Sequence, residues 1–256
     1  QEVTPGSGEF TFNEIEYRTA MEVYISGSTG YGITKVHKSI DSGDTWETIF
    51  EGDFGPATHI ALPVENTILI TTTNSIYKSV DNGITWYQST STNPNQIEYR
   101  SLYFSSPMLG YAMGIGGFAN VEKTTDGGDT WSGGTIPMGT VPYVNNISPV
   151  SGSVAWASGV GLNNTNYILR TNDGGANWTR QLENGFYQES SYVNFVHFWD
   201  TQNGIAMGDP SESDNDPNLF FEIYKTSDGG QNWTRVSSNN IPDDLPNEYG
   251  SSGDYF

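Results

Sequence analysis

The chain of 256 residues carries 30 acidic and only 10 basic side chains, a formal net charge of −20. Such a surface repels phosphate groups, which excludes nucleic acid as a partner and disfavours anionic membranes. There is no cysteine, so disulfides, thiolate catalysis and cysteine-ligated metals are excluded. No stretch approaches about 18 apolar residues, and we therefore expect no membrane insertion.

The composition favours strands and turns. Glycine (30 residues), tyrosine (15) and tryptophan (7) are abundant, while charged residues make up only 16% of the chain. Glycine suits turns and aromatic side chains suit pleated surfaces, so we expect an all-β protein. One all-β domain can take up the whole length, residues 1–256.

Strand-like segments follow one another in a fixed order along the chain. An inner strand comes first, then a second strand, and then an apolar strand that runs into an Asp-containing turn. This order repeats over residues 9–50, 56–91, 97–136, 141–183 and 190–237. Inner strands are predicted at 17–20, 59–62, 99–104, 143–147 and 192–198, and second strands at 23–27, 67–71, 110–114, 154–159 and 204–208.

An eight-residue motif, [Ser/Thr]-x-Asp-x-Gly-x-[Thr/Asn]-Trp, recurs in all five segments and is called the Asp motif below. Its aspartate can accept backbone N–H bonds from the following turn, and its glycine supplies a positive φ. Its tryptophan can cover the hairpin with an apolar face. The motif therefore indicates a turn that stabilises itself. We expect these residues to be structural and not catalytic: Asp41, Gly43, Trp46, Asp81, Gly83, Trp86, Asp126, Gly128, Trp131, Asp173, Gly175, Trp178, Asp228, Gly230 and Trp233.

The Asp motif resembles the Asp-box (BNR) repeat of sialidases, sortilin-type receptors and other glycan-active proteins. In those families the box joins the third and fourth strands of a propeller blade. The resemblance implies a β-propeller of four-stranded blades, of which five are visible. It implies little about activity, because the box occurs with unrelated functions.

Other stretches carry narrower resemblances. Residues 110–114 and 204–208, both Gly-x-Ala-Met-Gly, resemble repeats of photosystem II assembly-factor-like propellers. Residues 198–210 resemble Asp-box proteins exported by Bacteroidetes, which commonly carry a type IX secretion sorting domain. These resemblances imply an extracellular or cell-surface bacterial protein, as part of a larger surface assembly or by itself.

Residues 247–256 resemble the start of a further blade. Because open sheet edges invite aggregation, propeller rings close. Two arrangements remain open. Either the chain belongs to a ring of six to eight blades, or it closes as five blades with strands from 8–15 and 249–256 completing the seam.

Candidate ligand-binding residues lie on the predicted inner strands. Two Ile-Glu-Tyr-Arg stretches, at 15–18 and 97–100, are taken as equivalent. Aromatic and cationic groups at a channel mouth would bind a glycan or a protein. The alternative is packing, with each arginine paired to a neighbouring carboxylate. The candidates are Tyr17, Arg18, Tyr99, Arg100, Tyr143 and Tyr192.

Glycan hydrolysis is the competing function. The sialidase resemblance demands three arginines around the substrate carboxylate. Arg170, Arg180 and Arg235 flank Asp motifs, which places them on outer strands, so that arginine triad cannot be assembled. A xyloglucanase-like propeller needs two carboxylates about 5–10 Å apart. Glu98, Asp200 and Asp209 are the candidates, and spacing does not show that any two converge.

The acidic stretch 209–218 offers clustered carboxylate and amide oxygens. Asp209, Asp214 and Asp216 are therefore candidate calcium ligands, the alternative being a solvated loop. No other cofactor is expected. The leading hypothesis is a non-catalytic binding module.

Overall fold

The computed structural model describes residues 10–30, 32–93, 97–115, 119–136, 143–161, 165–183, 193–213 and 216–241, without the side chains of 134, 135, 183, 210–213, 216–221 and 238. These residues fall into two compact units, Gln1–Gly116 with Asn120–Gly134, and Gly117–Ala119 with Thr135–Phe256. Within the described ranges, no helix has the length and apolar character needed to cross a membrane.

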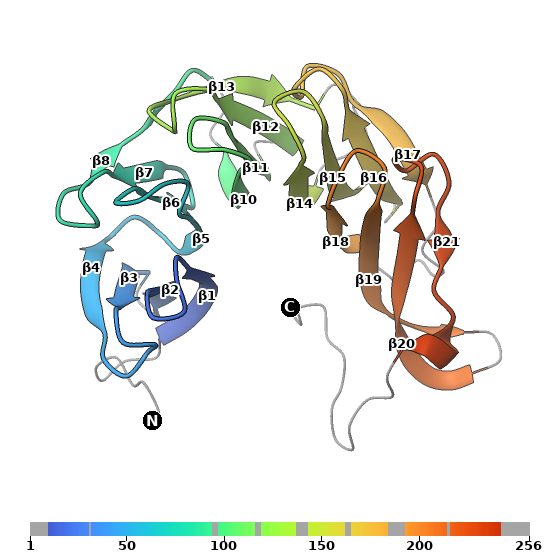
Figure 1. Cartoon of the computed structure of the whole chain (residues 1–256), viewed down its shortest axis with the longest axis horizontal. Helices are drawn as coiled ribbons and strands as arrows, with labels where there is room; N and C mark the ends of the chain where they lie inside the picture. Colours follow the sequence, from blue (N-terminus) through green and yellow to red (C-terminus); the bar gives the residue numbers. More distant parts are fainter. Residues whose placement is uncertain are drawn as a thin grey trace. The chain divides into compact units, whose positions relative to one another are not determined.

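The first unit contains three sheets, called blades 1, 2 and 3 (Figure 1), in which the four main strands pair in chain order. Blade 1 consists of β1 (Phe10–Tyr17), β2 (Val23–Thr29), β3 (Thr34–Ser39) and β4 (Glu47–Gly52). Blade 2 consists of β5 (Ala57–Ala61), β6 (Ile68–Thr72), β7 (Ile76–Ser79) and β8 (Tyr87–Gln88). Blade 3 consists of β10 (Glu98–Phe104), β11 (Gly110–Ile115), β12 (Ala119–Thr124) and β13 (Thr130–Thr135), with β9 (Thr90–Ser91) added beside β13.

The second unit contains blades 4 and 5, which have the same strand order. Blade 4 consists of β14 (Tyr143–Pro149), β15 (Ala155–Val160), β16 (Asn166–Thr171) and β17 (Thr179–Glu183). Blade 5 consists of β18 (Val193–Phe198), β19 (Gly204–Ser213), β20 (Asp216–Thr226) and β21 (Thr234–Arg235), followed by a 3-10 turn at Ser238–Asn240. The all-β, four-stranded prediction is confirmed.

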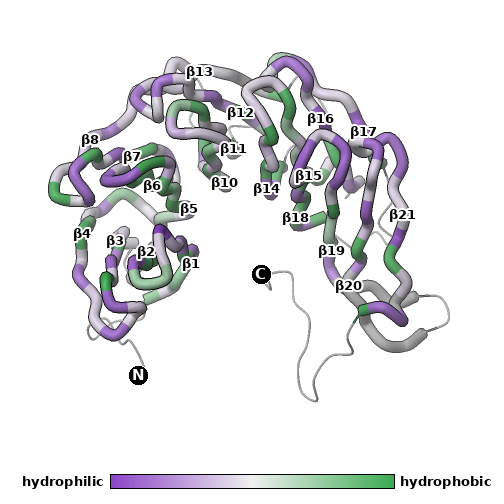
Figure 2. Tube along the Cα trace, viewed as in Figure 1, coloured by the Kyte–Doolittle hydropathy of each residue, from purple (hydrophilic) through white to green (hydrophobic). Residues whose placement is uncertain are grey.

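Within each unit, apolar side chains fill the space between neighbouring blades. Tyr24 of blade 1 packs with Ile60 and Ile68 of blade 2, and Trp156 of blade 4 packs with Val196 of blade 5. The second strands β2, β6, β11 and β15 are buried along almost their whole length. Figure 2 accordingly shows hydrophobic residues along β6, β11 and β15. Each fully buried large side chain contributes about 1.5–3 kcal/mol.

Each blade's first strand has a β-bulge at the same place in its register with the second strand. A bulge inserts one unpaired residue and turns it out of the ladder. The recurrence gives a common frame for comparing the blades. The bulged residues are Asn13, Thr58, Arg100, Asn145 and Asn194.

Candidate functional site

The Asp motif forms the turn between the third and fourth strands of every blade. In blade 1, Asp41 Oδ1 accepts from the backbone N–H of Thr45 at 2.8 Å, and Oδ2 accepts from its hydroxyl at 2.6 Å. Ser39 donates to the same carboxylate and accepts from the N–H of Gly43. The indole of Trp46 closes the turn by donating to the carbonyl of Gly43 at 2.9 Å. Asp81, Asp126, Asp173 and Asp228 have the corresponding bonds.

These hydrogen bonds favour the ionised carboxylates. Donation from the residue four positions on lowers the pKa of Asp41, Asp173 and Asp228 to about 2. Burial raises the pKa of Asp126, but the bonds from Thr130 outweigh it and bring that pKa to about 2. A carboxylate so occupied is a poor general acid or base at neutral pH.

Two successive residues of each motif turn have positive φ. The motif glycine is one of them, as predicted from its conformational freedom. The residue before it is the other: glycine in blades 3, 4 and 5, but Ser42 (φ 62°) and Asn82 (φ 67°) in blades 1 and 2. The sequence pattern did not reveal this second position, because blades 1 and 2 have serine and asparagine there in place of glycine.

The predicted equivalence of Tyr17-Arg18 and Tyr99-Arg100 is wrong. Tyr17 ends β1 opposite Val23, whereas Tyr99 directly precedes the bulge of β10. In the common register the counterpart of Tyr17 is Phe104. The predicted inner strand at 17–20 is wrong as well, because β1 spans Phe10–Tyr17. A short alternating stretch fits more than one register, and the bulge decides between them.

The six candidate residues have different surroundings. Tyr17 and Tyr143 are exposed at 60% and 52%, whereas Tyr99 is 4% exposed. Arg18 donates to the carbonyl of Thr67 at 3.0 Å, and Arg100 pairs with Glu98 at 2.5 Å. Tyr192 lies outside the described residues.

The candidate catalytic carboxylates have local partners of their own. Glu98 pairs with Arg100 in the first unit. Asp200 accepts from the side chain and backbone of Asn203, which lowers its pKa, in the turn before β19. Asp209 lies midway along that strand and accepts from the amide of Asn194. Asp200 and Asp209 therefore do not face each other.

The structure describes only part of the calcium candidate set. Asp214 and the side chain of Asp216 lie outside the description. Among the described residues, no three His, Asp or Glu side chains form a metal-binding group.

A pocket lies between blades 2 and 3, where the last strand of blade 2 leaves its sheet early. β8 pairs with β7 at only two positions, whereas β4 pairs with β3 at five positions in blade 1. After Ser89 the chain crosses to blade 3, where β9 runs parallel to β13. The N–H groups of Thr90 and Thr92 donate to the carbonyls of Asp129 and Trp131. This divergence leaves the pocket beside the start of β7.

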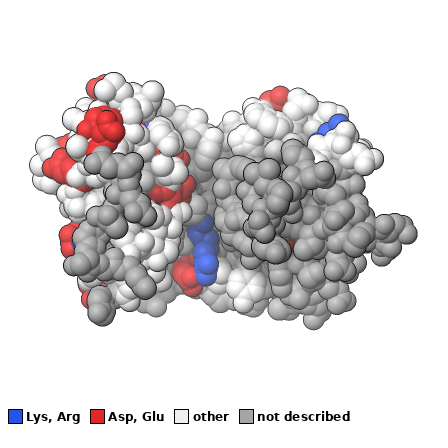
Figure 3. All heavy atoms as spheres, turned by 90° about the horizontal axis from the view of Figure 1, so that it is seen from below, with Lys and Arg blue, Asp and Glu red and all other residues white. Residues whose placement is uncertain are grey.

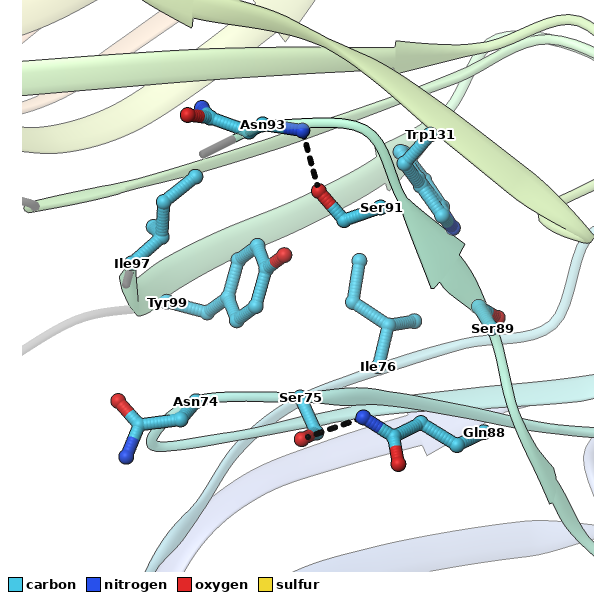
Figure 4. A pocket seen from close by; sticks show the side chains of 10 residues that line it. All are labelled: Asn74, Ser75, Ile76, Gln88, Ser89, Ser91, Asn93, Ile97, Tyr99 and Trp131. Carbon is cyan, nitrogen blue, oxygen red and sulfur yellow. Dashed lines mark hydrogen bonds between the residues drawn. The ribbon is translucent and has the colours of Figure 1, made fainter. Parts of the chain in front are cut away.

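The pocket has an apolar floor and a polar rim (Figure 4). Its volume is about 210 Å³, which corresponds to about seven waters at about 30 Å³ each. It therefore has room for a single side chain or sugar ring. Ile76, Ile97, Tyr99 and Trp131 form the buried floor, and Asn74, Ser75, Gln88, Ser91 and Asn93 form the rim.

Glu122 lies behind two of the lining residues. Its carboxylate accepts from the hydroxyl of Tyr99 at 2.6 Å and from the hydroxyl of Ser91. The Ser91 oxygen accepts in turn from the backbone N–H of Asn93, at 3.1 Å (Figure 4). Burial and the nearby Glu122 charge raise the pKa of Tyr99, so its phenol keeps the proton that it donates.

The sequence interpretation named Tyr99 and Trp131 but missed the rest of this pocket. One signal was present: residues 87–93 (Tyr-Gln-Ser-Thr-Ser-Thr-Asn) are almost entirely polar, whereas the chain after the other motifs contains apolar residues such as Phe50 and Leu182. Glu122 gave no such signal, because the charged Lys123 follows it on β12 and the local sequence does not mark it as buried.

No protein-family model and no curated protein matches the chain. Solved structures do. YCF48 from Cyanidioschyzon merolae aligns with a TM-score of 0.58 and 13% identity over 91% of this chain and 86% of its own. The fold is a β-propeller. A YCF48 bound to D1 peptide gives a TM-score of 0.63 and 16% identity over 91% of this chain and 69% of that one.

A GH74 xyloglucanase from Xanthomonas campestris aligns with a TM-score of 0.62 and 14% identity. The alignment covers 86% of this chain but only 37% of the enzyme. Identities this low establish the propeller architecture and do not carry an activity across, since one fold hosts many functions.

Proposed function

We propose that this propeller is a non-catalytic binding module, and that the pocket between blades 2 and 3 binds a short polar segment of a protein partner. The composition of the pocket lining supports this proposal most directly. Amide and hydroxyl groups surround an aromatic and aliphatic floor, with no charged side chain among the lining residues. Such a lining offers donors and acceptors for recognition but no acid–base pair. The peptide bound by YCF48 supports a protein partner.

A glycan is the alternative ligand, since amide-rich rims over aromatic floors also suit sugars. Glycan hydrolysis is the competing activity and draws support from the GH74 neighbour. Against hydrolysis, Glu98, Asp200 and Asp209 are each engaged locally, and Asp200 lies in the turn of the hairpin whereas Asp209 lies midway along β19. Two carboxylates at about 5–10 Å would be required.

We further propose that the protein acts outside a bacterial cell, free or in a surface assembly. The net charge of −20 supports this, because it keeps an exported protein soluble. Protease treatment of intact cells tests the location: digestion of the protein, or its recovery from the medium, supports the proposal, and complete protection contradicts it.

Arrays of peptides and glycans, run together with a hydrolysis screen, test the function. The double variant Asn74→Ala/Gln88→Ala removes two exposed rim amides without touching the core. We expect it to lose binding at least tenfold, while Gln202→Ala, exposed in the second unit, retains it. Glycan turnover would contradict a non-catalytic role, and unchanged binding by the double variant would exclude this pocket as the site.

A further inference from the structure

Glu122 is a fully buried carboxylate without a cationic partner. Its exposure is 0%, and its hydrogen bonds come from two neutral hydroxyls. None of the described Lys, Arg or His side chains forms an ion pair with it. Burying a carboxylate without an opposite charge is costly, so this arrangement calls for an explanation.

Blade 5 supplies an internal comparison. Glu222 is also 0% exposed, but Arg235 lies 3.1 Å from its carboxylate. Lys78, a buried cation on β7 of blade 2, is already paired with Asp129 at 2.7 Å. The chain therefore provides a positive partner for Glu222 but not for Glu122. Glu122 is instead hydrogen-bonded directly to side chains that line the pocket.

The charge of Glu122 reaches the pocket through the side chains that line it. Ser91 and Tyr99 both donate to the carboxylate, so their oxygens face the pocket with enhanced negative character. No charged side chain among the lining residues opposes this field, and the buried floor of the pocket screens it less than bulk water would. The net negative charge of the whole chain adds to this field. Figure 3 shows one face of the molecule, and on its described part acidic patches outweigh basic ones.

The aromatic floor suits the same kind of group. The rings of Tyr99 and Trp131 line the pocket, and a cation held over an aromatic face is attracted by its quadrupole. The volume of about 210 Å³ admits one side chain. We propose that the pocket binds a single basic side chain, the guanidinium of arginine or the ammonium of lysine, of a peptide partner. This specificity rests on the proposed binding function and sharpens it.

The test compares two capped pentapeptides, Gly-Ser-Arg-Ser-Gly and the same sequence with citrulline, a neutral isostere of arginine. Titrations are followed by calorimetry and by the NMR signal of the Trp131 indole, which lies in the pocket. We expect the arginine peptide to bind at least tenfold more tightly. Equal affinities would overturn the inference and leave the binding function standing, whereas no binding of either peptide would overturn both.

Variants assign the preference to Glu122. Glu122→Gln should abolish the discrimination, and Glu47→Gln, an equal charge change at an exposed site, should leave it intact. If Glu122→Gln does not fold, Gln88→Lys decides, because this exposed rim residue needs no core change. The added positive charge should weaken binding of the arginine peptide at least tenfold and binding of the citrulline peptide much less. Equal weakening of both peptides would contradict the inference.

Discussion

The side-chain amide of Asn145 donates to the backbone carbonyl of Val193 at 2.6 Å and thereby links blade 4 to blade 5. The bulge in β14 makes this bond available, because it turns Asn145 out of the ladder. The corresponding bulge residue of blade 1, Asn13, donates in the same way to Ala57 of blade 2. One irregularity of the strand thus serves two separate blade junctions.

Removing this link should weaken the second unit. We expect Asn145→Ala to lower the free energy of unfolding by about 1 kcal/mol, the net value of one hydrogen bond. Urea denaturation measures it. Asn74→Ala, an exposed asparagine, serves as the control and should stay within about 0.5 kcal/mol of the wild type. Equal stability of both variants would show that the Asn145 bond contributes nothing.

The motif aspartates predict a specific acid sensitivity. The folded-state pKa of Asp173 is about 2, below its ordinary value of 3.8, so its stabilisation is present above about pH 4 and is lost as the pH falls through 2. Asp173→Asn cannot titrate. We therefore expect this variant to be less stable than the wild type at pH 6, with the difference shrinking towards pH 2. Denaturant midpoints at several pH values measure this, and a pH-independent difference would contradict it.

Glycine at position 128 is required for two reasons. Its φ is +93°, and a Cβ there would lie 2.3 Å from Cδ2 of the buried Leu69 in blade 2. We expect Gly128→Ala to cost about 2–4 kcal/mol from backbone strain and overpacking. At Gly30 a Cβ meets no atom within 4 Å, so Gly30→Ala should change the melting temperature little. A similar small effect at Gly128 would disprove the interblade contact.

The two candidate arginines should separate experimentally. Arg18 donates to the Thr67 carbonyl of blade 2, so Arg18→Gln should cost about 1–2 kcal/mol. The pair between Arg100 and Glu98 is half exposed on both sides, and Arg100→Gln should cost less than about 0.5 kcal/mol. Peptide titration of the double variant tests the binding hypothesis: retained affinity would remove these arginines from the site.

The motif made the blades predictable because its information is local. Asp41 and Gly43 determine one turn through contacts within eight residues, and five copies imply five hairpins. The tyrosine and arginine candidates depended on register, which a bulge resets and which local alternation does not reveal. The pocket depended on the point at which the chain leaves its sheet after Ser89. Contacts with Asp129 and Trp131, some forty residues later, determine that point, so the local sequence does not reveal it.

The crossing segment also bears on how the first unit opens. Thr90 and Thr92 continue directly from β8 of blade 2, yet their amides are bonded to blade 3. Neither blade can detach from the other without breaking these bonds. Native-state hydrogen exchange should therefore find blades 2 and 3 opening as one cooperative unit, with the amides of Thr90 and Thr92 exchanging at the same rate as those of β13.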